Sequence, residues 1–244
     1  MIHIVTDFGP NGPYLGQMTA VLRRLAPEVP VIDLLNDAPA FEPRLSAYLL
    51  AALLAETEAG DIVLAVVDPG VGTARQPLAV EIDGRWLVGP DNGLFELALR
   101  RGRSCRVHRI AWRPARLSAS FHGRDLFAPV AADLARGQTG KLAPGRASRI
   151  ADWPDDLPAI VYVDRYGNAM TGMRAGAMPK GGTLKVGEHL LAEARVFGEA
   201  PPERAFWYVN ALGLIEIAMN GAAAAQRLKI SLGTKLVPGA ASEA

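Results

Sequence analysis

Apolar residues in the first 140 positions alternate between short strand-like segments and helical repeats. The short segments predict strands at Ile2–Thr6, Val29–Leu35 and Ile62–Val67, and the repeats predict helices between them at Tyr14–Leu25 and Pro43–Glu58. The third segment, Ile62–Val67, is unbroken and rich in β-branched residues, which is typical of a strand buried on both faces. The resulting βαβαβ order predicts parallel strands joined by right-handed crossovers.

The pattern continues with a predicted hairpin, Leu78–Ile82 with Trp86–Val88, and with helices at Asn92–Arg100 and Asp125–Arg136. Together these elements predict a Rossmann-like α/β domain with a mainly parallel sheet over residues 1–140.

Glycine, proline and polar residues then interrupt the pattern, which predicts a linker at residues 141–158. The remaining residues, 159–244, contain short strand-like runs at close spacing, separated by turn residues. Such spacing is typical of a small β-barrel or sandwich, and we predict a C-terminal β-barrel domain. Its expected strands are Ala159–Val163, Thr183–Val186, Glu188–Phe197, Phe206–Val209 and Leu214–Met219.

Composition narrows the function classes. A net charge of +1 gives no electrostatic reason to expect nucleic-acid binding. The single cysteine, Cys105, excludes an intrachain disulfide and is predicted to be a buried strand thiol. The N-terminus lacks signal-peptide features, and the longest apolar run, Leu45–Leu54, is too short to cross a bilayer. We therefore expect a cytoplasmic protein without membrane or nucleic-acid partners.

Candidate chemistry begins where the third predicted strand ends. Asp68 follows that strand, and Arg75 comes seven residues later, after a Pro-Gly-Val-Gly turn that lets the loop fold back. A paired aspartate and arginine would hold each other in place and lower the pKa of a bound water. A purely structural loop salt bridge is equally compatible with this spacing. The glycine loop lacks the Gly-Lys-Ser/Thr of a phosphate loop.

His122 is one of four histidines, and it lies in a loop between small residues, Ser120 and Gly123. A neutral imidazole there could accept a proton near physiological pH, although loop histidines are more often structural. The histidines lack the spacing of metal ligands, so no metal site is predicted.

Several acidic, aromatic or amide positions could bind a ligand. Asp7 follows the first predicted strand and could accept hydrogen bonds from a ribose diol or cap a turn. Asp164, Tyr166 and Asn168 form good β-turn chemistry, but an amide can also pair with a nucleobase edge and an aromatic ring can stack on it. Glu216 interrupts an apolar strand, so it must face solvent, a partner chain or a ligand.

In combination these segments resemble a known family, the S-adenosyl-L-methionine (SAM) hydroxide adenosyltransferases, which are relatives of the fluorinases and chlorinases. The similarity recurs in order over nearly the whole chain, and the two most specific segments are Val67–Gly72 and Phe121–Asp125. The other matching segments are Thr6–Gly9, Tyr14–Gly16, Arg75, Pro90–Gly93, Phe127–Pro129, Asp164–Asn168 and Asn210–Asn220.

The resemblance implies a homotrimer that binds SAM at subunit interfaces and hydrolyses it to adenosine and L-methionine without a cofactor. It implies that Asp68, Arg75 and His122 form the catalytic trio. It places Asp7 at the ribose, Asn168 and Phe197 at the adenine, and Asp164 near the methionine end. The remaining implied substrate contacts are Asn36, Phe121, Tyr166, Ala211, Glu216 and Ala218.

Two of these positions depart from the family pattern. Asn36 stands where a histidine is common, and Ala211 replaces a serine whose hydroxyl would help to bind the ligand. A non-catalytic adenosine or SAM sensor is therefore an alternative function. Halogenation is disfavoured because Asp68 would repel a halide and Gly123 offers no hydroxyl.

Overall fold

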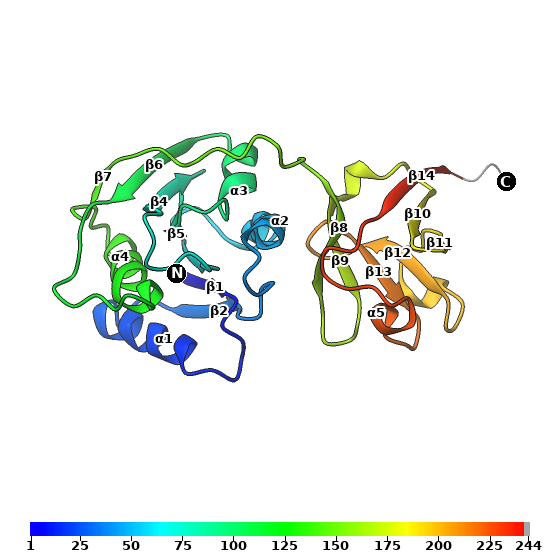
Figure 1. The fold of residues 1–244 in the computed structure, drawn as a ribbon, viewed down its shortest axis with the longest axis horizontal. Helices are drawn as coiled ribbons and strands as arrows, with labels where there is room; N and C mark the ends of the chain where they lie inside the picture. The colour runs from blue at the N-terminus through cyan, green and yellow to red at the C-terminus, as the bar shows by residue number, and fades with distance from the viewer. Residues whose placement is uncertain (242–244) are drawn as a thin grey trace. The chain divides into compact units, whose positions relative to one another are not determined.

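The computed structural model describes residues 1–241, which belong to two compact units, Met1–Ile150 and Ala151–Ala244 (Figure 1). Each unit has its own sheet system and is described by itself below. No helix among the described residues is long and apolar enough to cross a membrane.

The N-terminal unit is built on a seven-stranded sheet with the order β2-β1-β3-β5-β4-β6-β7. The pairings make β2, β1, β3, β5 and β6 run in one direction and β4 and β7 in the other, which confirms the predicted mainly parallel sheet. The strands are β1 (Ile2–Thr6), β2 (Val31–Leu35), β3 (Ile62–Val66), β4 (Pro77–Ile82), β5 (Arg85–Pro90), β6 (Cys105–Ile110) and β7 (Leu142–Pro144).

Helices cover this sheet in two pairs, α1 with α4 and α2 with α3 (Figure 1). Apolar side chains of α1 and α4 form one core with alternate residues of β1 and β3, as expected when every second strand residue faces the same layer. The helices are α1 (Tyr14–Leu25), α2 (Pro43–Leu53), α3 (Glu96–Arg101) and α4 (Ala128–Ala135), and a π-helical turn, Gly123–Phe127, precedes α4.

The register of the two central strands sets the position of the acidic residues that follow them. Thr6 of β1 lies opposite Val66 of β3, so the chain leaves both strands at the same edge of the sheet. Asp7 and Asp68 follow immediately beyond this edge. Open α/β sheets bind their ligands beyond the carboxyl ends of parallel strands, and the topology therefore places both carboxylates where a ligand is expected.

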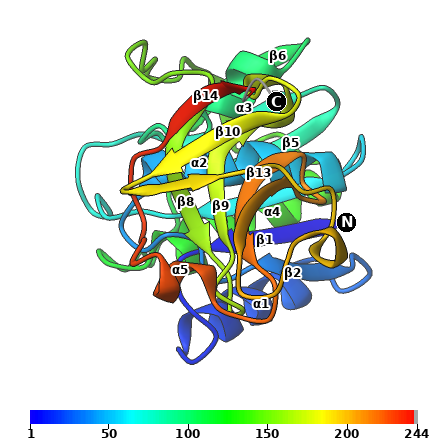
Figure 2. The ribbon, with the colours of Figure 1, turned by 90° about the vertical axis from the view of Figure 1, so that its right-hand side faces the viewer.

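The C-terminal unit contains two antiparallel sheets with the orders β12-β13-β9-β8 and β11-β10-β14, seen from another side in Figure 2. Apolar side chains of both sheets, among them the buried Trp207, form its core. The elements are β8 (Leu157–Val163), β9 (Ala169–Arg174), β10 (Gly182–Val186), β11 (His189–Leu191), β12 (Ala205–Val209), β13 (Leu214–Met219), α5 (Ala224–Arg227) and β14 (Val237–Ala241).

The predicted closed barrel is not found in the described residues. Instead of continuous ladders, isolated bridges pair Ala159 of β8 with Lys235 and Trp207 of β12 with Glu193, and Lys235 and Glu193 lie just outside β14 and β11. The strand predicted at Glu188–Phe197 is wrong beyond Leu191, because the backbone there leaves β10: Ala192 and Ala194 instead exchange backbone hydrogen bonds with Trp207 (both 3.0 Å).

The prediction of a buried thiol is also wrong. Cys105 is the first residue of β6 and is exposed. The apolar residues that suggested burial, Val107 and Ile110, lie further along the strand, and their greater burial does not extend back to its start.

Candidate functional site

The loop after β3 folds back on itself and pairs its acid with its arginine. Thr73 donates its hydroxyl and its N–H to the Gly70 carbonyl (2.7 and 3.1 Å), which closes the turn. Arg75 then donates from Nε to Asp68 Oδ1 (2.8 Å) and from Nη2 to Asp68 Oδ2. The two side chains are 8% and 5% exposed, so this bidentate pair is shielded from solvent and holds both groups in one orientation.

His122 joins this pair from a segment 47 residues away in the sequence. Its Nδ1 lies 3.2 Å from Arg75 Nη2. A guanidinium has donors and no acceptor, so Nδ1 must accept in this contact, and the neutral ring carries its proton on Nε2. Burial, reinforced by the positive charge of Arg75, lowers the pKa of His122 and favours that neutral form.

Gly72 allows the two loops that carry these residues to approach each other. Its φ is +82°, in the left-handed region, and a Cβ atom there would lie 2.8 Å from the Ala119 carbonyl oxygen. A real side chain would therefore force the loop of Asp68 and Arg75 away from the segment that leads to His122.

We expect Gly72→Ala to lower turnover ~10-fold or more, because small displacements of positioned groups are costly. It should also reduce the free energy of unfolding by about 1–3 kcal/mol beyond the effect of strain alone. Gly60→Ala is the matched control, since Gly60 also has a positive φ (+93°) but open space around it. Equal kinetics and equal denaturant midpoints for the two variants would contradict this role of Gly72.

Asn92, the first residue of a helix predicted from the sequence, is a positioning residue. Its Nδ2 donates to the Val67 carbonyl (2.8 Å) and its Oδ1 accepts from the Leu94 N–H (3.2 Å). It thereby fixes the chain directly before Asp68. The motif Pro90–Gly93 can be recognised in the sequence. The partner of Asn92, the carbonyl at the end of a strand 25 residues earlier, could not be predicted because it depends on the order of the strands in the sheet.

A cavity of about 340 Å³ lies at this edge of the sheet and exposes Asp68 and His122 to a ligand. Three aromatic rings, Phe8, Tyr14 and Phe121, contact one another in its wall, with centroids 5.2–5.8 Å apart. The complete lining is Asp7, Phe8, Tyr14, Phe41, Val66, Asp68, Val71, Ser120, Phe121, His122 and Gly123. Aromatic walls with a few convergent polar groups are typical of small-molecule sites.

Asp7 lines this cavity and Asn36 does not. The Phe41 N–H donates to Asp7 Oδ2 (3.1 Å), and burial raises the pKa of the carboxyl despite that bond. Phe41 itself is 75% exposed and has a φ of +62°. The side chain of Asn36 instead donates to Asp33 (2.6 Å). Of these two predicted substrate contacts, the structure therefore brings only Asp7 to the cavity.

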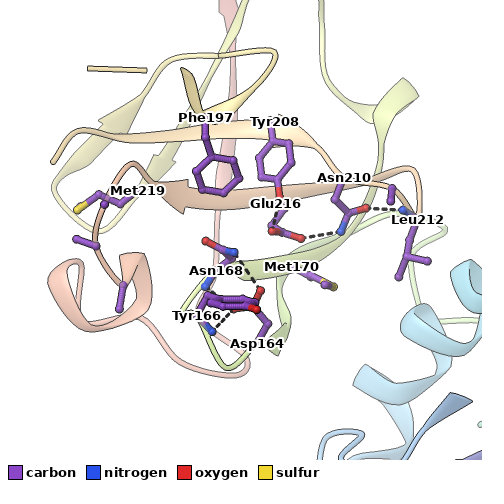
Figure 3. A pocket seen from close by; sticks show the side chains of 14 residues that line it. Asp164, Tyr166, Asn168, Met170, Phe197, Tyr208, Asn210, Leu212, Glu216 and Met219 are labelled. Carbon is purple, nitrogen blue, oxygen red and sulfur yellow. Dashed lines mark hydrogen bonds between the residues drawn. The ribbon is translucent and has the colours of Figure 1, made fainter. Parts of the chain in front are cut away.

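The C-terminal unit has a separate cavity of about 780 Å³ (Figure 3). Asp164, Tyr166 and Asn168 lie together at its wall, on the loop between β8 and β9. Asp164 accepts hydrogen bonds from the backbone N–H groups of Tyr166 and Asn168 and from Asn168 Nδ2, at 2.8–3.0 Å. The loop is thus a carboxylate-centred turn that also presents an aromatic ring and an amide to the cavity.

Glu216 is a buried acid at the wall of the same cavity (Figure 3). It is 2% exposed and accepts hydrogen bonds from the Tyr208 hydroxyl (2.6 Å) and from Asn210 Nδ2 (2.7 Å). Burial raises the pKa of Glu216, and burial next to this carboxylate raises the pKa of Tyr208. Sequence reasoning did not assign Tyr208 a role, because its place opposite Glu216 follows from the β12–β13 register.

Of the remaining predicted substrate contacts, two line the cavity of the C-terminal unit and one lies in the core. Phe197 and Ala211 line the cavity, and the Phe197 ring meets the Tyr208 ring at 5.6 Å. Ala218 is fully buried in a small apolar cluster with Ala200 and Phe206 and is not a lining residue. In residues 1–241, no group of three or more histidine, cysteine, aspartate or glutamate side chains is placed to hold a metal ion.

Comparisons with known proteins agree over both units. Residues 2–143 match the model of the SAM hydroxide adenosyltransferase N-terminal domain, and residues 158–237 match that of the C-terminal domain. A Thermus thermophilus protein named (R)-S-adenosyl-L-methionine hydrolase is 38% identical, with 95% of this chain and 96% of the relative covered. A protein of the same name from Salinispora arenicola is 36% identical, with 96% of each chain covered.

Two crystal structures share the fold. A conserved hypothetical protein from Thermus thermophilus has a TM-score of 0.77 at 36% identity, with 97% of this chain and 98% of that chain covered. An uncharacterized conserved protein from Thermotoga maritima has a TM-score of 0.87 at 25% identity, with 98% and 100% covered.

Proposed function

The chain belongs to the SAM hydroxide adenosyltransferase family, and we propose on this premise that it hydrolyses SAM to adenosine and L-methionine. The observation that carries the proposal is the shielded contact of Asp68, Arg75 and His122 beside a cavity at the carboxyl ends of parallel strands. An arginine and an imidazole held together by an acid are suited to orienting and activating one water molecule.

The proposed reaction is an in-line displacement at C5′ of the adenosyl group. A water oxygen forms the new bond to C5′, and the C5′–S bond breaks with its electron pair going to sulfur. Methionine leaves as a neutral thioether, so cancellation of the sulfonium charge makes it a good leaving group, and one proton is released. The protein therefore has to position and activate water rather than to assist the leaving group, and we propose that no cofactor is needed.

Each member of the trio has a distinct proposed task. Asp68 accepts both donors of Arg75 and fixes the guanidinium plane. Arg75 and the Nε2–H of neutral His122 donate to the water, which lowers its pKa and favours attack as hydroxide. The lowered pKa of His122 supports this assignment, because a neutral imidazole does not repel the sulfonium.

We propose that the substrate is bound by residues of both units within a homotrimer whose sites lie at subunit interfaces. Asp7 would bind the ribose, and the wall containing Phe121 would pack on the sugar. Asn168 and Phe197 would bind the adenine with Glu216, and Asp164 would lie near the methionine end. The presence of these polar and aromatic residues on two cavities supports the division of roles. The single cysteine is compatible with a cytoplasmic setting.

The test is to incubate the purified protein with SAM and to separate the products by chromatography. Equal amounts of adenosine and methionine are expected. Because relatives are named (R)-S-adenosyl-L-methionine hydrolases, the two sulfonium epimers should be supplied separately, and we expect faster consumption of the (R) epimer. Tight adenosine binding without turnover of either epimer would instead support the sensor function.

The pH dependence of kcat/KM is expected to follow the protonation of His122. Its pKa is lowered from the ordinary value of 6.5, so the ring is neutral at pH 7 and becomes protonated only below its own lowered pKa. We expect kcat/KM to be constant near neutral pH and to decline at lower pH, as the ring becomes protonated and stops accepting from Arg75. A kcat/KM profile from about pH 5 to about pH 8 measures this, because that window spans the ordinary titration range of histidine. A decline of kcat/KM with a midpoint above the ordinary pKa of 6.5 would contradict the role of neutral His122.

A further inference from the structure

A second cavity of the N-terminal unit borders the catalytic trio and has no part in the proposed reaction. We name it the arginine cavity. It has a volume of about 370 Å³ and reaches two members of the trio, Arg75 and His122. Its lining is Thr73, Arg75, Gln76, Pro77, Arg109, Ile110, Ala111, Trp112, Arg113, Leu117, His122 and Leu126.

The charges of this lining are unbalanced. It contains three arginines and no aspartate or glutamate. Arg75 is neutralised by Asp68, which does not line the cavity. Arg109 and Arg113 are exposed, and no hydrogen bond or ion pair connects their guanidinium groups to any other described residue. Two arginines whose guanidinium groups have no partner among the described residues thus line a concave space.

The walls of the arginine cavity strengthen the field of these charges. Trp112, Leu117 and Leu126 contribute apolar surface to the same lining. Low-dielectric walls around charges of one sign concentrate the potential and raise the local concentration of counter-ions. Guanidinium groups bind oxyanions with two parallel hydrogen bonds, so Arg109 and Arg113 fit an anion of this kind best.

We propose that the arginine cavity binds a small inorganic oxyanion, such as sulfate or phosphate, beside Arg75 and His122. The substrate itself is a poor occupant, because SAM carries a net positive charge and the cavity would repel it. The cavity has room for an anion with part of its hydration shell, since one water molecule takes about 30 Å³.

The bound anion would change the protonation of His122. The positive charges of Arg75 and Arg113 now disfavour the imidazolium, and the negative charges of Asp68 and Asp125 favour it. An oxyanion beside Arg113 would offset the positive charges of the two arginines and so raise the pKa of His122. If the proposed function holds, the anion would therefore slow hydrolysis on the acidic side of neutrality. Binding itself does not depend on that function.

The experiment follows the imidazole signals of the whole protein by NMR while sodium sulfate replaces sodium gluconate at constant ionic strength. His122→Asn identifies the signal of His122. We expect a saturable shift of that signal with sulfate and a higher midpoint in its pH titration. Arg113→Gln and Arg109→Gln should each weaken sulfate binding ~10-fold or more, since each removes a charge-assisted contact.

Arg116→Gln is the matched control, because Arg116 lies in the same exposed segment and does not line the arginine cavity. An equal loss of sulfate binding in this control would show general charge screening and overturn the proposal, as would a linear response without saturation. Sulfate binding without SAM turnover would leave the anion site standing and refute the proposed function. Turnover without sulfate binding would refute the anion site alone.

Discussion

Asp68→Asn is expected to lower SAM turnover at least ~100-fold while the protein remains folded. Asn keeps the size of the side chain but replaces one acceptor oxygen by an NH₂ group. That group would face a donor of Arg75, so the bidentate pair breaks and the guanidinium loses its fixed plane. The contact of Arg75 with His122 depends on the same plane, and both donors for the water are lost together.

The measurement is kcat for the (R) epimer, with the denaturant midpoint as the check on folding. Glu81→Gln is the matched control. Glu81 accepts two hydrogen bonds from Arg106 (2.9 and 3.0 Å) in the same sheet, but this exposed pair does not line the cavity of Asp68. Its loss should leave kcat within about twofold of the wild type, since exposed pairs contribute little. A rate for Asp68→Asn near that of Glu81→Gln would refute the role of Asp68.

The parallel strands could be predicted because burial on both faces leaves a clear signal. β3 is a continuous apolar run and β1 is mostly apolar, and each strand is buried at all five positions. β9 escaped prediction, since Ala169–Arg174 mixes methionine, threonine and glycine without a clear alternation. The predicted barrel rested on strand spacing, and spacing does not determine whether the border strands pair along their length or at single bridges.

In the site, too, contacts between residues close in the sequence could be predicted, whereas contacts that depend on the tertiary fold could not. Asp68 and Arg75 lie seven residues apart, so a turn between them could be predicted from the glycines. The contact of Arg75 with His122 spans 47 residues and depends on the close approach at Gly72. The pairing of Tyr208 with Glu216 follows from strand register, and a one-residue shift would have removed it.

A mixture of two inactive variants should recover activity if the sites lie at subunit interfaces. One variant, His122→Ala, loses the trio in the N-terminal unit. The other, Phe197→Ala combined with Glu216→Gln, damages the cavity of the C-terminal unit. In a homotrimer each site would draw its two halves from neighbouring subunits. Random mixing then leaves about a quarter of the sites with both halves intact.

Variants that are refolded separately and then mixed should show below about 1% of wild-type kcat. Variants that are refolded together should show about a quarter of wild-type kcat. Size-exclusion chromatography of each preparation checks that the trimer has formed. Activity that stays at background in correctly assembled mixed trimers would mean that each subunit supplies its own complete site. The two cavities would then have to serve one substrate within a single chain, and the proposed interface would be wrong.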